Sequence, residues 1–394
     1  MITILGSTGT IGKNTLAVLK NESIKIFALT ARINKKLLYK QIIRHKPPYA
    51  VIESKNDADY LSDLCKKNSI KTKILYGKEG LVFVASHHKN TYVLSAIVGA
   101  AALEPTYAAV IKGKKVLLAN KESLIMSGSL LVKAAKKFNA LLIPVDSEHN
   151  AILQILTTFG SEYSSKHSNY TKSLKEIFIT ASGGPFLGYS KKQLEKVTPA
   201  QAIKHPTWKM GKKISIDSAT MMNKGLEVIE ASILFRLDPE KIKILIHPES
   251  LIHAMIHFMD GSIISHMSPH DMKVAISYAL SWPNRSKSYG NGLEVKSLKS
   301  LSFRNVKKNE FKCLDLCIKA LKLGFNAPTI LNAANEVAVE KFLENKIKFI
   351  DIPVIIDKAL RCMPISKNSS LKSILLCDQL TRNYVNNYID KIWK

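Results

Sequence analysis

ILGSTGTIG, residues 4–12, follows an apolar run at the start of the chain and precedes a helical stretch. Its three glycines, Gly6, Gly9 and Gly12, stand three residues apart. Small residues at this spacing let the backbone approach a ligand closely, and the N-terminus of the following helix attracts a pyrophosphate. A glycine pattern alone is weak evidence, but a place at the first strand-to-helix junction makes it more specific. The stretch therefore predicts a dinucleotide-binding turn, with a tight turn that binds no ligand as the alternative.

Apolar, β-branched runs recur along the first third of the chain, with amphipathic spans between them. This alternation is typical of a parallel sheet covered by helices on both faces. Ligands bind such sheets at the carboxyl ends of the strands. Residues 120–122 and 146–148 follow two of the runs, so we expect them at a ligand site. The predicted strands are MITILG (1–6), SIKIFALT (23–30), YAVIES (49–54), TKILYG (72–77), YVLSAIV (92–98), KKVLLAN (114–120) and ALLIPV (140–145).

The pattern changes after about residue 151. Strand-like runs and helices mix up to residue 281, a stretch rich in Asn, Ser and Gly follows, and the last part has helical period. A chain of 394 residues exceeds what one hydrophobic core usually supports. We therefore expect an α/β protein with a Rossmann-like domain (1–146), a central α/β domain (147–281), a linker (282–307) and a C-terminal helical domain (308–394).

The formal net charge of +27 raises the possibility of a nucleic-acid-binding protein. The basic residues, however, form short pairs along the whole length, such as Lys35-Lys36 and Lys191-Lys192. We therefore expect solvated faces and no nucleic-acid partner, although the field would favour a negatively charged small substrate. The five cysteines are scattered and odd in number, which favours a reducing compartment. No apolar run is long enough to span a bilayer, so a cytoplasmic protein without a membrane partner is expected.

Three carboxylates, Asp146, Glu148 and Glu227, form the most informative set of side chains. Asp146 and Glu148 lie one residue apart at the end of a predicted strand, where strand alternation would point both to one side. Two like charges on one side repel unless a cation lies between them. Oxygen-only ligands suit Mg²⁺ or Mn²⁺ better than Zn²⁺. We therefore predict a metal site assembled from two distant segments.

Two motifs in the central region suit a phosphorylated substrate. TASGGPF (180–186) offers a flexible backbone and the hydroxyl of Ser182, although a structural bend is an alternative. DSATMMNKGLE (217–227) holds Ser218, Asn223 and Lys224 near Glu227, and Asn223 and Glu227 share a helical face. Lys224 could then contact a phosphate while Glu227 contacts the metal.

A loop in the central region and the second strand bear on cofactor use. AIKHPTWKMG (202–211) carries His205, Trp208 and Gly211, which suits a lid that expels water before hydride transfer. IFALTARIN (26–34) has no acid where an NAD site would hold the ribose 2′-hydroxyl, and it offers Arg32 instead. This favours NADPH, with an ordinary solvated arginine as the alternative.

Eight blocks, taken together and in this order, resemble the 1-deoxy-D-xylulose 5-phosphate reductoisomerase family. The resemblance runs from residue 4 to about residue 345. It implies an NADPH-binding domain, a catalytic domain that binds metal and substrate, and a C-terminal helical domain, in a homodimer. The blocks are GSTGTIG (6–12), LLANKESL (117–124), PVDSEHNAI (144–152), ASGGPF (181–186), HPTWKMG (205–211), DSATMMNKGLE (217–227), IHPES (246–250) and LNAANE (331–336).

The resemblance also implies a reaction. The family converts 1-deoxy-D-xylulose 5-phosphate to 2-C-methyl-D-erythritol 4-phosphate with NADPH and Mg²⁺ or Mn²⁺, in non-mevalonate isoprenoid biosynthesis. Retro-aldol cleavage and direct migration both remain open for the change of carbon skeleton. Another NAD(P)-dependent reductase of a phosphorylated substrate is the rival interpretation, but it gives no reason for three metal-directed acids.

Residue roles follow from the matching blocks. Metal ligands are expected at Asp146, Glu148 and Glu227, and catalytic groups at Glu148, Lys121 and His205. The chain departs from the family at Arg32-Ile33-Asn34, where a Gly-Lys or Gly-Arg pair is common, so the basic residue expected at the 2′-phosphate has moved one place. Cofactor contacts are expected at Thr8, Gly9, Thr10, Ile11, Arg32, Ile33, Asn34, Asn120 and Gly211. Substrate contacts are expected at Lys121, Glu122, Ser147, Glu148, Ser182, His205, Trp208, Ser218, Asn223, Lys224 and Glu227.

Overall fold

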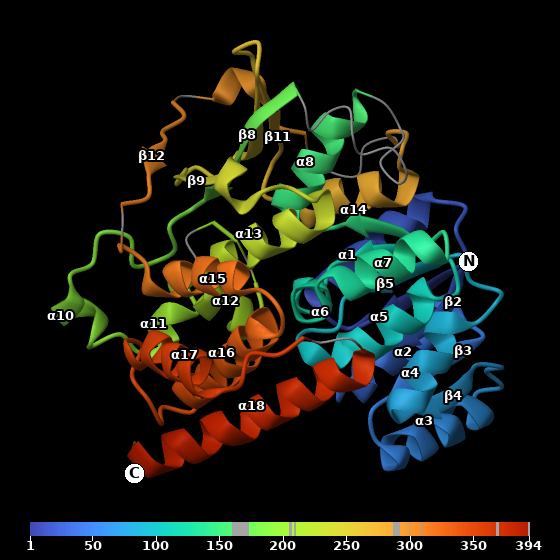
Figure 1. The fold of residues 1–394 in the computed structure, drawn as a ribbon. Coiled ribbons are helices and arrows are strands. Elements are labelled where there is room, and N and C mark those ends of the chain that lie inside the picture. The colour runs from blue at the N-terminus through green and yellow to red at the C-terminus, as the bar shows by residue number, and fades with distance from the viewer. Residues whose placement is uncertain are drawn as a thin grey trace. The chain divides into compact units, whose positions relative to one another are not determined.

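The structure, a computed structural model, describes residues 1–159, 173–204, 207, 208, 210–286, 292–298, 300–307, 309–367 and 370–392. The chain divides into two compact units (Figure 1). The first consists of Met1–Ser123, Leu131–Asn150 and Asp271–Asn291, and the second of Leu124–Leu130, Ala151–His270 and Gly292–Lys394. Each unit has its own β-sheet.

The sheet of the first unit has seven parallel strands in the order β4-β3-β2-β1-β5-β6-β7. All seven strands expected from the sequence are present. The strand order reverses between β1 and β5, and such a switch point is where doubly wound sheets bind ligands. The strands are β1 (Ile2–Leu5), β2 (Ile26–Thr30), β3 (Tyr49–Ile52), β4 (Lys73–Tyr76), β5 (Tyr92–Ser95), β6 (Lys115–Leu118) and β7 (Leu141–Pro144).

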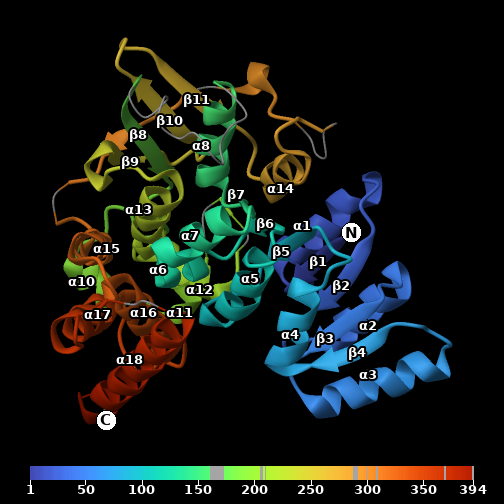
Figure 2. The same ribbon diagram turned by 45° about the vertical axis from the view of Figure 1, so that its right-hand side comes forward.

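Helices connect these strands and cover the sheet (Figure 2). α1 packs against α14, and α4 packs against α5. Asn34 and Ser54 cap the N-termini of α2 and α3 with their side-chain oxygens, as expected for residues with short polar side chains. The helices of this unit are α1 (Thr10–Val18), η1 (Leu19–Asn21), α2 (Lys35–His45), α3 (Lys55–Lys67), α4 (Gly77–Ser86), η2 (Ala100–Ala102), α5 (Leu103–Val110), α7 (Ser129–Lys137, from residue 131) and α14 (Met272–Ser281).

Three of the described helices cross the boundaries between the units along the chain: α6 (Lys121–Ser127), α7 (Ser129–Lys137) and α8 (Ser147–Thr157). α6 and α8 begin in the first unit and continue in the second. Both start just after a strand of the parallel sheet, β6 and β7 respectively. The side chains at their first turns are therefore held at the carboxyl end of that sheet.

The sheet of the second unit has five strands in the order β11-β10-β8-β9-β12. β8 and β9 are parallel, and the other neighbours are antiparallel. The strand-like runs EIFITASGGPF (176–186), IKILIHPES (242–250) and GSIISHMS (261–268) predict β8, β9 and β11, whereas β10 and β12 were not predicted as strands. The strands are β8 (Leu174–Ala181), β9 (Ile242–Ile246), β10 (Ile252–Phe258), β11 (Ile263–Met267) and β12 (Arg304–Asn305).

Helices make up most of the rest of the second unit. α13, α15, α16, α17 and α18 contribute to one hydrophobic core, which includes Leu226, Ile330, Phe342, Ile356 and Val385. The expected helical period of the C-terminal part is confirmed. No helix in the described part of the chain combines the length and hydrophobicity of a membrane span. The helices are α10 (Lys191–Leu194), α11 (Pro199–Ala202), α12 (Lys212–Ala219), α13 (Met222–Phe235), η3 (Pro239–Lys241), η4 (Val295–Ser297), α15 (Lys312–Leu323), α16 (Ala327–Leu343), α17 (Asp351–Cys362) and α18 (Leu371–Ile392).

Candidate active site

The glycine-rich segment forms the turn between β1 and α1. Gly6 has φ +85°, a backbone conformation that L side chains rarely adopt. A Cβ on Gly12 would lie 2.4 Å from the carbonyl oxygen of Gly6 and 2.5 Å from Cα of Ser7, so only glycine lets α1 pack this closely on the turn. Gly9, the N-cap of α1, has no side chain to cover the first N–H groups of the helix. The turn therefore has the shape and the positive helix end that a pyrophosphate requires.

Arg32, Ile33 and Asn34 follow β2 at the same edge of the parallel sheet. The Arg32 side chain is 82% exposed, and its Nε donates to Glu53 at 3.1 Å. Asn34 is the N-cap of α2, and its Oδ1 accepts from the backbone N–H of Leu37. The guanidinium thus stands at the carboxyl end of the second strand, where an arginine accommodates a 2′-phosphate.

Asn120, Lys121 and Glu122 lie where β6 gives way to α6. Asn120 is buried, and its carboxamide donates to the carbonyl oxygens of Ile97 and Gly99 and to Glu122. Its Oδ1 accepts from the backbone N–H of Ser123, which fixes the start of α6. The Asn120 side chain is therefore occupied by structural hydrogen bonds.

Asp146, Ser147 and Glu148 lie at the start of α8. β7 ends at Pro144, so Asp146 and Glu148 are not strand residues, and the expected strand alternation between them is wrong. Asp146 instead accepts the backbone N–H of Glu148 at 3.2 Å, because a short acidic side chain satisfies the open N–H groups of a helix start. Ser147 Oγ donates to Glu148 Oε2 at 2.6 Å.

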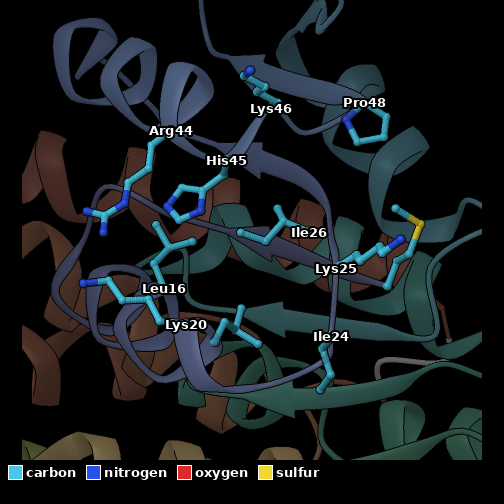
Figure 3. A pocket seen from close by; sticks show the side chains of 11 residues that line it. Leu16, Lys20, Ile24, Lys25, Ile26, Arg44, His45, Lys46 and Pro48 are labelled. Carbon is cyan, nitrogen blue, oxygen red and sulfur yellow. The ribbon is translucent and has the colours of Figure 1, made fainter.

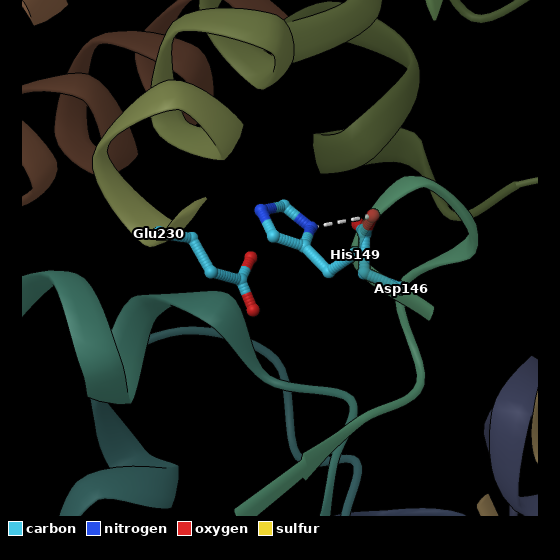
Figure 4. Close-up of side chains that lie close together, drawn as sticks. All are labelled: Asp146, His149 and Glu230. Carbon is cyan, nitrogen blue, oxygen red and sulfur yellow. Dashed lines mark hydrogen bonds and ion pairs between the residues drawn. The ribbon is translucent and has the colours of Figure 1, made fainter. Parts of the chain in front are cut away.

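Asp146 has two further partners. Lys121 Nζ lies 2.8 Å from Asp146 Oδ2. On the other oxygen, His149 Nδ1 lies 3.0 Å from Asp146 Oδ1 (Figure 4). Burial works against the charged form of Asp146, but Lys121 and His149 outweigh it and hold the pKa of this carboxyl well below its usual range. Asp146 is therefore an ionised carboxylate already placed beside a cation. His149 was not singled out from the sequence, although its position three residues after an acid at a helix start could have indicated it.

The second unit holds Ser182 and Ser218 in neighbouring segments. Ser182 follows β8, and Gly183 and Gly184 after it have φ +86° and +73°. A Cβ on Gly184 would lie 2.8 Å from the carbonyl oxygen of Ser218 at the end of α12, so the glycine loop packs directly on that helix end. The segments that carry Ser182 and Ser218, two of the residues predicted to bind the substrate, are therefore in contact.

Asn223, Lys224 and Glu227 share the first turns of α13. Asn223 Nδ2 and Lys224 Nζ both donate to the carboxylate of Glu227. Lys224 and Glu227 are buried, so this ion pair is shielded from solvent. The expected pairing of Asn223 and Glu227 on one helical face is present, and Lys224 contacts the acid as well.

The predicted lid is described in part. His205 lies outside the described residues, whereas Trp208 stacks edge-on against His270, with ring centroids 5.5 Å apart, and lies 6.1 Å from the ring of His253 on β10. Gly211 is the exposed N-cap of α12, and a Cβ there would meet no atom of the described chain. The segment therefore leads from an aromatic cluster into α12.

The donor set of the three predicted metal ligands fits a hard divalent cation. All are carboxylates, and each accepts a hydrogen bond from a lysine or a hydroxyl: Asp146 from Lys121, Glu148 from Ser147 and Glu227 from Lys224. Asp146 and Glu148 belong to the first unit and Glu227 to the second. Oxygen ligands of this kind suit Mg²⁺ or Mn²⁺.

Comparisons with known proteins agree along the whole chain. Residues 2–128 match the profile of 1-deoxy-D-xylulose 5-phosphate reductoisomerase, residues 142–235 that of its C-terminal domain, and residues 267–384 a further DXP reductoisomerase C-terminal domain. The enzyme of that name from Clostridium botulinum (strain Loch Maree / Type A3) is 41% identical over 99% of both chains. The one from Buchnera aphidicola subsp. Schizaphis graminum is 44% identical over 97% of this chain and 96% of its own.

Solved structures give the same result. A DOX-P reductoisomerase in complex with NADPH, fosmidomycin and magnesium superposes with a TM-score of 0.94 at 40% identity, over 99% of this chain and 98% of that one. The enzyme from Zymomonas mobilis in complex with NADPH gives 0.90 at 37% identity over 99% of both chains. The chain therefore belongs to the 1-deoxy-D-xylulose 5-phosphate reductoisomerase family.

Proposed function

We propose that this chain converts 1-deoxy-D-xylulose 5-phosphate to 2-C-methyl-D-erythritol 4-phosphate, by an isomerisation and a reduction that use NADPH and a divalent metal. The observation that carries this proposal is the set of three carboxylates, Asp146 and Glu148 at the start of α8 and Glu227 paired with Lys224 in α13, in a chain of this family. A reductase that needs no metal would not require these three acids.

We propose that Asp146, Glu148 and Glu227 bind one Mg²⁺ or Mn²⁺ ion. Three carboxylates from two segments give the oxygen-only donor set that these ions prefer. When bound, the cation supplies a Lewis acid for the carbonyl and hydroxyl oxygens of the substrate, and NADPH supplies the hydride for the reduction. Glu148 and Lys121 are the proposed catalytic groups of the first unit, since a carboxylate can hold a proton and an ammonium can donate to a substrate oxygen. His205 is proposed as the third.

The substrate's phosphate is assigned to the second unit. Gly184 packs against Ser218, so the hydroxyls of Ser182 and Ser218 lie on adjoining segments that include flexible backbone. Lys224 supplies the positive charge. The other proposed substrate contacts belong to the sequence blocks that match the family. They are Lys121, Glu122, Ser147, Glu148, Asn223, Glu227, Trp208 and His205.

NADPH is assigned to the turn between β1 and α1. Thr8, Gly9, Thr10 and Ile11 provide the helix start, and Arg32 provides a cation for the 2′-phosphate. Ile33, Asn34, Asn120 and Gly211 are the other proposed contacts. With these roles, residues 1–146 form the NADPH-binding part, 147–281 the catalytic part, 282–307 a linker and 308–394 a C-terminal helical part.

A homodimer is proposed as the working form. β11 is an edge strand of the second sheet, and Met259, Ile263 and Ile264 beside or within it expose 67%, 55% and 39% of their surface. An edge strand with exposed apolar side chains readily pairs with another chain. A cytoplasmic location is also proposed, because Cys65, Cys313, Cys317, Cys362 and Cys377 are all free thiols.

The test is NADPH oxidation with 1-deoxy-D-xylulose 5-phosphate. Activity should appear with Mg²⁺ or Mn²⁺, disappear after treatment with EDTA and return when the cation is restored, and 2-C-methyl-D-erythritol 4-phosphate should be the product. No oxidation under these conditions would refute the proposal. Undiminished oxidation after EDTA would favour the rival reductase instead.

A further inference from the structure

A pocket of about 580 Å³ lies in the first unit, at the amino-terminal edge of the parallel sheet (Figure 3). Its volume is within the range of small-molecule sites. The walls come from the beginnings of β1 and β2 and from the C-terminal ends of α2 and of α1 with η1. The dinucleotide turn begins at the other end of β1, so the pocket is distinct from the proposed cofactor site.

The pocket has an apolar inner surface. Leu16 and Leu19 are buried side chains of α1 and η1, and Ile24 and Ile26, around the start of β2, are half-buried. Aliphatic surface of this kind gains free energy when a ligand's hydrocarbon group removes it from water. The inner surface therefore favours a ligand with an apolar part.

The rim of the pocket is basic. Lys20, Lys25, Arg44 and Lys46 line it, and all four are exposed. None of the described residues that line it is acidic. In Figure 3 the side chains of Lys20 and Arg44 lie on the same side of the pocket as His45. The rim therefore favours an anion.

Helix ends explain only part of this charge. Lys20 and Arg44 lie in the last turns of η1 and α2, where cations stabilise the negative end of a helix. Each helix end carries a charge of about −0.5, so two ends balance about one of the four cations. Lys25 lies next to a strand and has no helix end to balance. A surplus of positive charge thus remains around the apolar surface.

The positive charge of the rim also affects the pKa of His45. Burial lowers its pKa, and the charges of Arg44 and Lys20 lower it further. Burial first, and the neighbouring cations second, therefore favour the neutral form of this imidazole. An anion placed among these cations would reverse the effect and raise the pKa of His45.

We propose that this pocket binds a small organic anion with an apolar group, such as an alkyl phosphate, and that the bound anion alters NADPH affinity. The second part rests on the proposed function. α1 (Thr10–Val18) begins at the glycine turn and is followed by η1, which carries Lys20 of the pocket. α2 (Lys35–His45) begins after its N-cap Asn34, and its last turn carries Arg44 and His45 of the pocket. Both helices therefore join the proposed cofactor contacts to the pocket. A ligand that shifts either helix at one end changes the geometry at the other, and the effect must be reciprocal.

The test uses n-hexyl phosphate as probe, with inorganic phosphate and hexanol as separate comparisons. The pKa of His45 is followed by NMR, with the His45→Gln spectrum used for assignment. The pKa should rise with n-hexyl phosphate, and this readout needs no NADPH. An equal response to inorganic phosphate would mean that the apolar surface plays no part and would overturn the proposed ligand class. No response to any probe would overturn the site.

Matched variants separate this pocket from any phosphate contact at the active site. Lys20→Gln with Arg44→Gln removes two rim charges, and Lys66→Gln with Lys67→Gln removes two exposed charges at the end of α3, outside the pocket. The first pair of substitutions should weaken the binding of n-hexyl phosphate roughly two- to thirtyfold, as expected for the loss of two exposed ion pairs. The second pair should leave this affinity unchanged. Equal weakening by both pairs would show general electrostatics and overturn the site.

Coupling is tested on the same proteins. NADPH affinity, measured by fluorescence titration, should change with n-hexyl phosphate in the wild type and stay constant in the Lys20/Arg44 variant. A change in both proteins would place the effect at the active site and overturn the coupling, as would binding at His45 with unchanged NADPH affinity. Normal probe binding by a protein that does not bind NADPH at all would count against the proposed function alone.

Discussion

Replacement of Gly12 by Ala tests whether the close packing of α1 on the dinucleotide turn supports both the stability of the fold and NADPH affinity. The new Cβ would lie 2.4 Å from the Gly6 carbonyl oxygen, about 1 Å less than the 3.4 Å of an ordinary contact, and the neighbouring atoms belong to backbone that cannot rotate away. Such overpacking costs about 1–3 kcal/mol, reduced by the ~0.4–1 kcal/mol that Ala gains over Gly through the unfolded chain. α1 must then move away from the turn.

Gly9→Ala is the matched control in the same turn. Its Cβ would lie 3.4 Å from the Gly6 carbonyl oxygen, and Gly9 has φ −76°, which Ala adopts easily. Urea unfolding should show a loss of about 1–2 kcal/mol for Gly12→Ala and a change within about 0.5 kcal/mol for Gly9→Ala. NADPH affinity should fall roughly tenfold or more for Gly12→Ala, because the helix start moves relative to the pyrophosphate. Wild-type stability and wild-type NADPH affinity in Gly12→Ala would refute the reasoning.

Three other substitutions test the site and its surroundings. Glu227→Gln should lower turnover roughly a hundredfold or more while NADPH affinity stays within about twofold, since a metal ligand is lost and the turn is untouched; equal losses in steady-state kinetics and NADPH titration would indicate a structural role. Arg32→Ala should raise KM for NADPH roughly tenfold and leave KM for NADH unchanged, and similar kcat/KM for the two cofactors in the wild type would contradict this. Burial lowers the pKa of Lys115 to about 8 in the folded protein, below the ordinary value of 10.5. Between about pH 8 and 10.5 the Lys115 amine is therefore protonated in the unfolded chain and neutral in the folded one, so the free energy of unfolding rises with pH. Lys115→Met should remove that rise, and parallel urea midpoints of the two proteins across this range would rule the assignment out.

The sequence predicts the first unit better than the second, for a physical reason. In a parallel sheet every strand is a short β-branched run between helices, so each of the seven strands is visible locally. In the second sheet β10 pairs with β8 and β11 through contacts that no local pattern encodes, and its segment IHAMIHF mixes apolar residues with two histidines. Its strand character is decided by tertiary pairing.

Site residues follow a similar division. The family, the fold class and the use of NADPH and a divalent metal, all expected from sequence blocks, agree with the comparisons. Roles of single residues stay predictions, and the structure adds partners that spacing could not give. His149 contacts Asp146 because α8 begins at Ser147, so that the two residues lie three apart at a helix start. Asn120 is held by the carbonyl oxygens of Ile97 and Gly99 from another loop. These contacts depend on the exact residues at which helices and strands begin and end, and the local sequence pattern defines those ends poorly.

The ion pair between Lys224 and Glu227 predicts a linkage between phosphate and metal. Both side chains are buried, and a buried charge is stable only when it is paired. A divalent cation at Glu227 would take over the role of Lys224 and leave that ammonium for the phosphate of the substrate. Inorganic phosphate should therefore bind more tightly in the presence of Mg²⁺, and Mg²⁺ more tightly by the same factor in the presence of phosphate.

Calorimetric titration of each ligand with and without the other measures both factors, and a Lys224→Met variant should lose the linkage while Mg²⁺ still binds. A control with Lys243, an exposed lysine of β9, replaced by Met should keep it. If phosphate affinity did not depend on Mg²⁺, Lys224 would already be available to the phosphate, and its pairing with Glu227 would have to persist in the bound state. The effect of Mg²⁺ on phosphate affinity therefore decides whether Lys224 stays paired with Glu227 or contacts the phosphate of the substrate.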